Sequence, residues 1–333
     1  MSNFFEYGYV LPKVELHLHL DCSLSYEVVR ALRPEISEET YREQFVAPRR
    51  CTNLADFLKH APKGFELMQT EEELRAVTSD VIRQLRADNV IYGEVRFAPL
   101  LHLAKGLTPE AVVETVDAAT TDAMRETGTE VRLVLCTLRH FSTEQGLITA
   151  ALVKKFKGTN VVALDLAGDE AGYPIESHVP AYEYARANNL CRTAHAGEAA
   201  GAQSVWDTLR LLNPNRIGHG VRSIEDAALV SSLREQQIHL EVCPSSNLQT
   251  NVYREMAEHA LDALYCAGLS VSISTDARTI TDITLEQEYE NMRRAFGWTD
   301  EKFLKCNLNA VEAAFIPDDL KKQLSARLRG AYS

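Results

Sequence analysis

The sequence predicts an α/β fold, a closed (β/α)8 TIM barrel with a helical lid insertion after its first strand. Eight short, apolar runs alternate with longer amphipathic stretches along the 333 residues. This alternation is typical of parallel strands joined by crossover helices. No Pro/Gly/Ser-rich linker divides the chain, and barrels of this type run to about 250 residues or more as one unit. We therefore expect residues 1–333 to form a single domain.

The strands of this barrel are expected where β-branched and apolar residues cluster. The eight runs cover 14–20, 90–98, 130–138, 161–167, 191–196, 216–219, 238–243 and 269–275. Between them, stretches such as 72–88 and 110–126 carry the apolar periodicity of an amphipathic helix. An open, doubly wound sheet is the alternative, but it predicts a glycine-rich phosphate turn after the first strand. HLDCSLS follows that strand instead, which favours the closed barrel.

The connection between the first two strands is much longer than one crossover helix requires. It spans about 24–88, and the surplus at roughly 35–70 contains TNLADFLKHAPKGFELM. Leu54, Phe57 and Leu58 lie at i, i+3 and i+4 and so share one helical face. That face could pack on the outside of the barrel, or it could cover the mouth as a lid, because long insertions in barrels are often functional.

Composition restricts the classes of partner. The formal net charge is −12, which disfavours nucleic acid and anionic membrane surfaces and suits a small, weakly charged substrate. Seven cysteines without a C-x-x-C pair indicate neither a disulfide framework nor a zinc ribbon. We find no signal peptide in MSNFFEYGYVLPKVELH and no membrane-spanning run. We therefore expect a cytoplasmic protein; its oligomeric state is left open, and a monomer is compatible with the sequence.

Ionisable side chains occupy the ends of several predicted strands. His17 and His19 are two residues apart on the first strand, so both point into the barrel. His195 ends the fifth strand and Asp276 the eighth. Because the carboxyl ends of barrel strands meet on one face, these four groups can converge. Three imidazoles and a carboxylate suit a catalytic divalent metal, with zinc favoured.

Two further groups fit catalysis next to such a metal. Glu198 follows His195 by three residues, and His219 ends the sixth strand between two glycines, which indicates close backbone approach. Ordinary explanations exist for single residues: Glu198 could be an acid in the first turn of a helix, and Asp276 could cap one. Their joint occurrence at strand ends favours an active site. The other histidines are expected to have structural or supporting roles, and Cys243 lacks a base that would make it a nucleophile.

With these residues in view, the sequence resembles the adenosine deaminase family of the amidohydrolase superfamily over essentially its whole length. The segments that carry the resemblance are PKVELHLHLD (12–21), NLADFL (53–58), VIYGEVRFAP (90–99), DLAGDE (165–170), HAGE (195–198), RIGHG (216–220), EVCPSSN (241–247) and STDA (274–277). An H-x-H pair alone is common among barrel hydrolases. HAGE followed by GHG and a final TD is highly specific.

The resemblance implies hydrolytic deamination of adenosine or 2′-deoxyadenosine to inosine or 2′-deoxyinosine, with release of ammonia. It implies one zinc ion per chain, held by His17, His19, His195 and Asp276. Glu198 would protonate purine N1, His219 would orient and deprotonate the attacking water, and Asp276 would accept a hydrogen bond from it.

The same resemblance assigns the substrate contacts. Asp21 would bind the ribose 5′-hydroxyl, the Gly168 N–H would bind purine N3, and His19 would border the substrate. Leu54, Phe57 and Leu58 match apolar lid residues of the family, which favours the lid over an outer helix. The partner is thus a small purine nucleoside.

Two positions depart from the family pattern and leave the substrate open. Ala277 stands where a second acid usually contacts purine N7, which leaves N7 to Arg278, to a water or to no partner. Cys22 replaces the usual Gly beside Asp21. The alternatives are therefore another 6-aminopurine nucleoside, such as 6-aminodeoxyfutalosine or 5′-methylthioadenosine, a ring-opening amidohydrolase, or a non-catalytic zinc protein. A ring-opening relative commonly uses a carboxylated lysine, and no strand end offers one.

Overall fold

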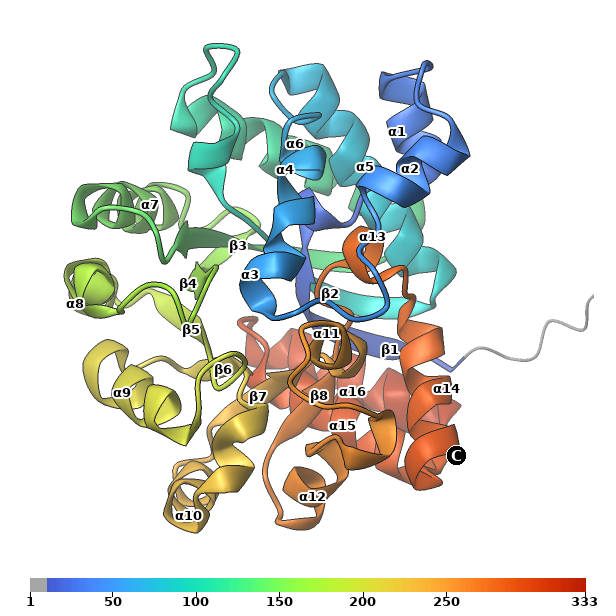
Figure 1. The fold of residues 1–333 in the computed structure, drawn as a ribbon, viewed down its shortest axis with the longest axis vertical. Helices are drawn as coiled ribbons and strands as arrows, with labels where there is room; N and C mark the ends of the chain where they lie inside the picture. The colour runs from blue at the N-terminus through green and yellow to red at the C-terminus, as the bar shows by residue number, and fades with distance from the viewer. Residues whose placement is uncertain (1–10) are drawn as a thin grey trace, which may run out of the picture.

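Eight parallel strands in the order β1 to β8 surround the centre of the molecule (Figure 1). The computed structural model describes residues 11–333; the first ten residues, where we expect no signal peptide, lie outside the described residues. The strands are β1 (Lys13–His19), β2 (Val90–Phe97), β3 (Glu130–Leu138), β4 (Val161–Ala167), β5 (Cys191–Ala196), β6 (Arg216–His219), β7 (His239–Val242) and β8 (Val271–Ile273). The predicted (β/α)8 barrel is confirmed, and the open-sheet alternative is wrong.

A short bridge joins the last strand to the first. Leu18 pairs with Asp276, just beyond β8, in parallel. The N–H of His19 donates to the Asp276 carbonyl at 2.7 Å, and the N–H of Asp276 donates to the His17 carbonyl at 3.0 Å. The closure of the barrel therefore fixes the main chain of Asp276 between two histidines of β1.

Helices surround this sheet and connect its strands. The α-helices are α1 (Tyr26–Leu32), α2 (Glu38–Gln44), α3 (Leu54–Phe57), α4 (Ala61–Phe65), α5 (Glu71–Ala87), α6 (Pro109–Thr127), α7 (Thr143–Lys155), α8 (Val179–Ala187), α9 (Ala202–Leu212), α10 (Ala227–Glu235), α11 (Pro244–Gln249), α12 (Leu261–Cys266), α13 (Arg278–Thr281), α14 (Leu285–Phe296), α15 (Asp300–Ala313) and α16 (Asp318–Ala331). Six 3-10 turns complete the described part: η1 (Leu20–Cys22), η2 (Leu58–His60), η3 (Pro99–Leu101), η4 (Glu176–His178), η5 (Val221–Glu225) and η6 (Met256–Glu258).

Local signals explain why the two predicted helices begin and end where they do. The Thr70 side chain accepts from the Glu73 N–H and starts α5. Thr108 does the same for Ala111 at the start of α6, which then ends at Gly128 in the left-handed conformation. These are ordinary N-caps and a C-terminal glycine stop. The expected stretches at 72–88 and 110–126 therefore agree with the observed helices within a residue.

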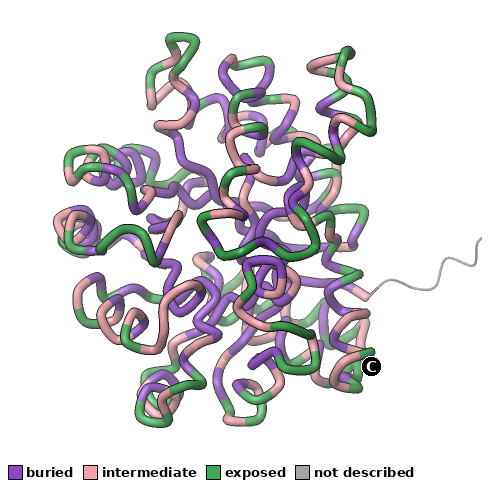
Figure 2. The backbone as a smooth tube through the Cα atoms, viewed as in Figure 1, coloured by how far each residue is buried: buried purple, intermediate pink, exposed green. Residues whose placement is uncertain are grey.

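The apolar core is formed by side chains of the strands and of the helices around them. In Figure 2 the central strands are mostly coloured as buried. Inside the barrel, in contrast, several inward side chains are charged and fully buried, among them Arg96, Arg216 and Glu241. No helix within residues 11–333 is long and apolar enough to cross a bilayer.

The connection between β1 and β2 contains six helical segments and then α5. From its middle, Leu54 and Phe57 of α3 pack against Ala277 and Ile280, which follow β8. In Figure 1, α3 and α13 lie near each other in front of the barrel strands. The insertion thus reaches across the carboxyl ends of the strands.

Candidate active site

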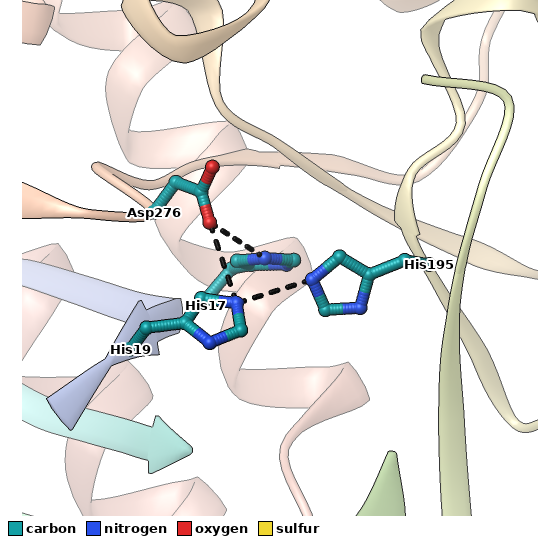
Figure 3. Close-up of side chains that lie close together, drawn as sticks. All are labelled: His17, His19, His195 and Asp276. Carbon is teal, nitrogen blue, oxygen red and sulfur yellow. Dashed lines mark hydrogen bonds and ion pairs between the residues drawn. The ribbon is translucent and has the colours of Figure 1, made fainter. Parts of the chain in front are cut away.

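Four predicted ligand side chains meet at the carboxyl end of the barrel (Figure 3). The Nε2 atoms of His19 and His195 lie 3.1 Å apart. Asp276 Oδ1 lies 3.2 Å from His17 Nε2 and 3.4 Å from His19 Nε2. One ligand atom from each of the four residues falls within 4.8 Å of every other. The atoms that could bind a metal therefore all face one point.

The chemistry of this cluster fits a divalent metal. His17 Nε2 is buried and has no partner with hydrogen-bond geometry. Burial lowers the pKa of His19 well below its ordinary value and also lowers that of His195. Neutral imidazoles with converging lone pairs are the form in which histidine binds metal. An unpaired buried nitrogen is costly, and a cation at the centre would satisfy it.

Two buried carboxylates accept hydrogen bonds from the Nδ1 atoms of His17 and His195. Glu241 Oε2 accepts from His17 Nδ1 at 3.0 Å, and Asp165 Oδ1 accepts from His195 Nδ1 at 3.2 Å. Such contacts place the ring proton on Nδ1 and leave Nε2 free for a metal. Arg96 joins both carboxylates, donating to Asp165 at 3.0 Å and to Glu241 at 2.6 Å. Although burial alone would raise it, the charges of Arg96 and Arg216 hold the pKa of Glu241 well below its ordinary value.

Our sequence reasoning did not assign these supporting residues, although the sequence carried a signal for them. Asp165, Glu241 and Arg96 are charged residues inside otherwise apolar strand runs. A lone charge at an inward position of a buried strand requires a partner. Which charge meets which depends on the closed barrel, and the sequence alone does not give that pairing.

Two active-site candidates adopt the left-handed backbone conformation, which is uncommon for residues other than glycine. Asp276 has φ 66° and His219 has φ 59°, and such backbone strain often occurs at functional sites. The predicted close approach of the backbone beside His219 is present: a Cβ on Gly218 would lie 2.9 Å from His17 Cε1. Gly220 has φ 69°. Both glycines therefore allow His219 to sit against the ligand cluster.

Glu198 is placed to act as an acid. Its Oε2 lies 3.6 Å from His219 Nε2, while its Oε1 is buried without a hydrogen-bond partner. Burial, together with the negative charges of Asp276 and Glu170, raises the pKa of Glu198 well above its ordinary value. This shift favours the protonated carboxylic acid over the carboxylate.

Glu170, which our sequence reasoning also missed, fixes the loop that carries Glu198. Its carboxylate accepts from the N–H groups of Gly197, Glu198 and Ala200 at 2.7, 3.0 and 2.9 Å. The Ser204 hydroxyl donates to it at 2.5 Å. Glu170 lies in the segment DLAGDE, so the motif was visible, but its loop-binding role requires the fold.

A small pocket of about 50 Å³ opens onto these groups. Its polar side is formed by His19, His195, Glu198, His219 and Asp276, and its apolar side by Leu54, Phe57, Leu58, Ala277 and Ile280. The predicted lid residues thus lie opposite the ionisable groups, in the wall of the same pocket.

The residues assigned to the sugar and to N3 lie at one side of this pocket. Gly168 borders it and also a neighbouring cavity of about 260 Å³, which Asp21 borders as well. Burial raises the pKa of Asp21 to about 6. His102 is buried, with its Nε2 4.0 Å from Asp21 Oδ2 and its Nδ1 bonded to the Met68 carbonyl at 3.0 Å. It therefore lies behind Asp21, as expected for a residue that supports the site.

Comparison with known proteins identifies the family of the chain. The family model for adenosine deaminase matches residues 12–330. The chain belongs to the adenosine deaminase family. A curated adenosine deaminase from Clostridium perfringens is 35% identical over 94% of this chain and 97% of its own.

Solved structures of other proteins share the fold of this adenosine deaminase family member. An adenine deaminase from Arthrobacter aurescens superposes with a TM-score of 0.89 at 25% identity, covering 96% of this chain and 98% of the other. An amidohydrolase from Burkholderia ambifaria, solved with bound zinc, superposes with a TM-score of 0.89 at 22% identity, covering 99% and 95%.

The structure rules out Arg278 as the residue that contacts purine N7 in place of the acid missing at Ala277. Arg278 does not line the pocket and so does not replace the missing acid at Ala277, because its guanidinium is held by Glu15 at 2.7 Å and Asp88 at 2.8 Å. Cys22 borders both cavities, and burial raises the pKa of its thiol well above the ordinary value.

Burial likewise raises the pKa of Cys243 well above its ordinary value, so that this thiol stays protonated. A thiol is a weak nucleophile compared with its thiolate. The raised pKa therefore argues against Cys243 as a nucleophile, although its Sγ and ligand atoms of His17, His219 and Asp276 lie within 4.8 Å of one another.

Proposed function

We propose that the protein is a zinc-dependent deaminase that converts adenosine or 2′-deoxyadenosine to the corresponding inosine and ammonia. The observation that carries this proposal is that the buried carboxyl of Glu198, whose pKa is raised, and four side chains able to hold a metal face one pocket. We assign one zinc ion per chain to His17, His19, His195 and Asp276. The donor set contains no thiolate, which is typical of a catalytic site.

The chemistry follows from the positions of the surrounding groups. Zinc bound at such a site lowers the pKa of a water towards neutrality and so supplies a nucleophile. Glu198 donates its proton to purine N1, which makes C6 more electrophilic. His219, beside Glu198, orients the attacking water towards C6. The water oxygen adds at C6; one of its protons goes to the amino group, and the other replaces the proton that Glu198 gave to N1. The C6–N bond then breaks, and the amino group leaves as ammonia.

The pocket also orients the substrate. With N1 at Glu198, the purine N7 edge points to the opposite wall, where Ala277 and Ile280 offer no hydrogen bond from their side chains. We assign N3 to the Gly168 N–H and the ribose 5′-hydroxyl to Asp21. Leu54, Phe57 and Leu58 form a lid that covers the base, and His19 borders it.

A second candidate keeps the reaction and changes the 5′ group. The cavity of about 260 Å³ beside Asp21 has apolar walls from Leu58, Ala61, Phe65, Leu101 and Leu138. Among the described residues that line it, none is Lys or Arg, so it suits an apolar 5′ substituent, as in 5′-methylthioadenosine, better than a phosphate. 6-Aminodeoxyfutalosine stays a further alternative.

The compartment and the class of partner are inferred from the cysteines and the net charge of the chain. All seven cysteines are unpaired, as is usual for proteins of the reducing cytoplasm, where we place this protein as a single domain. We propose no nucleic-acid or membrane partner, since the net charge is −12. A ring-opening amidohydrolase is disfavoured because no lysine lines the pocket of about 50 Å³ within the described part of the chain.

A spectrophotometric screen tests the proposal. Purified, zinc-loaded protein is incubated with adenosine, 2′-deoxyadenosine, adenine, AMP, 5′-methylthioadenosine and 6-aminodeoxyfutalosine, and the ultraviolet band of the 6-aminopurine is followed. We expect loss of that band and release of one ammonia per nucleoside, fastest with a nucleoside. Turnover of none of these compounds would reject the proposal; a preference for a 5′-modified nucleoside would select the second candidate.

A further inference from the structure

A chain of buried hydrogen bonds runs from His219 away from the pocket. His219 Nδ1 lies 3.1 Å from Asn247 Nδ2, and Asn247 Oδ1 lies 3.2 Å from His259 Nε2. All three residues are buried, with Asn247 on α11 and His259 just before α12. Neither Asn247 nor His259 borders the cavity that holds Glu198 and His219, so neither touches the substrate directly.

The donor and acceptor in each of these hydrogen bonds follow from the contact at His259, the residue most distant from the pocket. The main-chain N–H of Leu261 can only donate, and it donates to His259 Nδ1 at 3.1 Å. His259 Nδ1 is therefore without a proton. Burial lowers the pKa of His259 to about 3, so the ring is neutral and its single proton lies on Nε2.

The orientation of the Asn247 amide determines which nitrogen of His219 accepts a hydrogen bond. Since His259 Nε2 donates, it needs the amide oxygen, and the amide N–H must then face His219. The N–H donates to His219 Nδ1, which cannot carry a proton while it accepts. Turning the amide over would place its N–H against the N–H of His259 Nε2, two donors facing each other, whichever tautomer His219 adopts.

We propose that Asn247 and His259 are positioning residues that keep His219 Nδ1 as a hydrogen-bond acceptor, so that the ring proton lies on Nε2, the nitrogen that faces Glu198 and the pocket. His219 then acts first as a hydrogen-bond donor that orients the oxygen nucleophile. It cannot remove the first proton from the attacking water, because the nitrogen facing the pocket already carries one. This role differs from the deprotonation that the family resemblance implies, and for its consequence in turnover it rests on the proposed function.

The location of the proton can be measured directly. Zinc-loaded protein labelled with ¹⁵N-histidine gives separate resonances for protonated and unprotonated ring nitrogens, and a His219→Gln spectrum identifies the His219 signals. We expect wild-type His219 to carry its proton on Nε2. A His219 ring protonated on Nδ1, or on both nitrogens, at neutral pH would overturn the proposal, whether or not adenosine is the substrate.

The isosteric variant Asn247→Asp should reverse the hydrogen bond between residue 247 and His219. In Asn247→Asp, a carboxylate accepts from both neighbouring rings, so the His219 proton should move to Nδ1. The wrong tautomer of a catalytic histidine costs up to about 10⁴-fold in turnover, and we expect a kcat loss of about 10²-fold or more with little change in KM or zinc content. Asn309→Asp is the matched control, because Asn309 Nδ2 bonds only the Val271 carbonyl, at 3.4 Å. A His219 proton that stays on Nε2 in Asn247→Asp contradicts the proposal.

A second pair of variants keeps the test valid if Asn247→Asp does not fold. His259→Gln retains an N–H that can donate to the Asn247 oxygen, whereas His259→Leu does not. We expect one His219 tautomer in the Gln variant and a second, Nδ1-protonated population in the Leu variant. Identical His219 spectra in the two variants would contradict the role of His259.

Discussion

Glu170 binds the main chain of Glu198 and at the same time acts on its side chain. The Glu198 N–H donates to Glu170 Oε2 at 3.0 Å. The Glu170 charge adds to burial and to the charge of Asp276 in raising the pKa of the Glu198 carboxyl. Glu170 therefore both positions the main chain of Glu198 and contributes to the raised pKa of its carboxyl.

The first prediction concerns the pH dependence of turnover in Glu170→Gln. Turnover requires protonated Glu198, whose pKa in the folded protein is raised, so activity should be present at low pH and lost as the pH rises through that pKa. Removing the Glu170 charge should move this alkaline limit to lower pH. Misplacement of the loop by about 1 Å could also cost about 10²-fold in rate. The check is a pH profile of kcat for both proteins at equal zinc content; identical alkaline limits would argue against the electrostatic role of Glu170.

The second prediction concerns the acid itself. Glu198→Gln should keep its zinc and lose about 10²–10⁴-fold in kcat, because an amide cannot donate a proton to N1 as an acid does. Glu225→Gln is a suitable control and should retain activity. Glu225 forms a partly exposed ion pair with Arg222 in the wall of a wider cavity that Glu198 also borders. The assay is adenosine turnover with metal analysis of each preparation. Near wild-type turnover in Glu198→Gln would remove this residue from the acid role.

The third prediction concerns recognition of the base at Ala277. This residue is buried in an apolar cluster with Leu54, Phe57 and Ile280, so the wild-type wall gives N7 no side-chain partner. We expect 7-deazaadenosine, which lacks the N7 acceptor, to be deaminated with a kcat/KM within a few-fold of adenosine. In Ala277→Asp, burial in this apolar cluster favours the protonated acid, whose O–H can donate to N7. Adenosine should then gain about fivefold over the 7-deaza analogue, as one hydrogen bond of about 1 kcal/mol allows, at unchanged zinc content. An unchanged ratio would show that this position does not read N7.

The fourth prediction concerns stability in acid. His239 is 2% exposed, and its two ring nitrogens bond the hydroxyls of Ser270 and Ser272 at 2.8 and 2.9 Å. Burial, followed by the charge of Arg216, lowers its pKa to about 3. Between the unfolded value of about 6.5 and that pKa, only the unfolded chain binds the proton, so this contribution to stability falls as the pH drops below 6.5.

At pH 5 the loss from His239 should be about 2 kcal/mol relative to pH 7. His239→Asn removes this titration, so its free energy of unfolding should fall by about 2 kcal/mol less than that of wild type over the same pH range. Urea unfolding at pH 7, 6 and 5 measures the difference. Parallel pH curves for the two proteins would mean that His239 is not held neutral.

Much of the fold could be predicted from the sequence, because buried parallel strands are apolar and regularly spaced. The run at 161–167 coincides with β4, and that at 191–196 with β5. The last run, 269–275, was too long: β8 covers Val271–Ile273, because the chain then leaves β7 and pairs with β1 through Asp276. That bridge depends on barrel closure, which no local pattern records.

The candidate site was predictable in its ionisable groups but less so in what holds them. His17 and His19 were visible from their period-2 spacing, whereas their supports come from other strands. Arg278 illustrates the limit: its buried partners, Glu15 and Asp88, lie far away in the sequence. A side chain next to a motif thus turned away from the pocket, and only the three-dimensional structure shows this.

A titration with zinc tests the central claim most directly. Metal-free protein, prepared by chelation, is given zinc in fractions of one equivalent while adenosine turnover is recorded. Activity should be absent without metal and should rise linearly to a break at one zinc per chain. His195→Ala, which removes one ligand, should neither bind zinc tightly nor turn over adenosine. Full turnover by the metal-free protein, or zinc-saturated protein with no turnover of any 6-aminopurine nucleoside, would contradict the account.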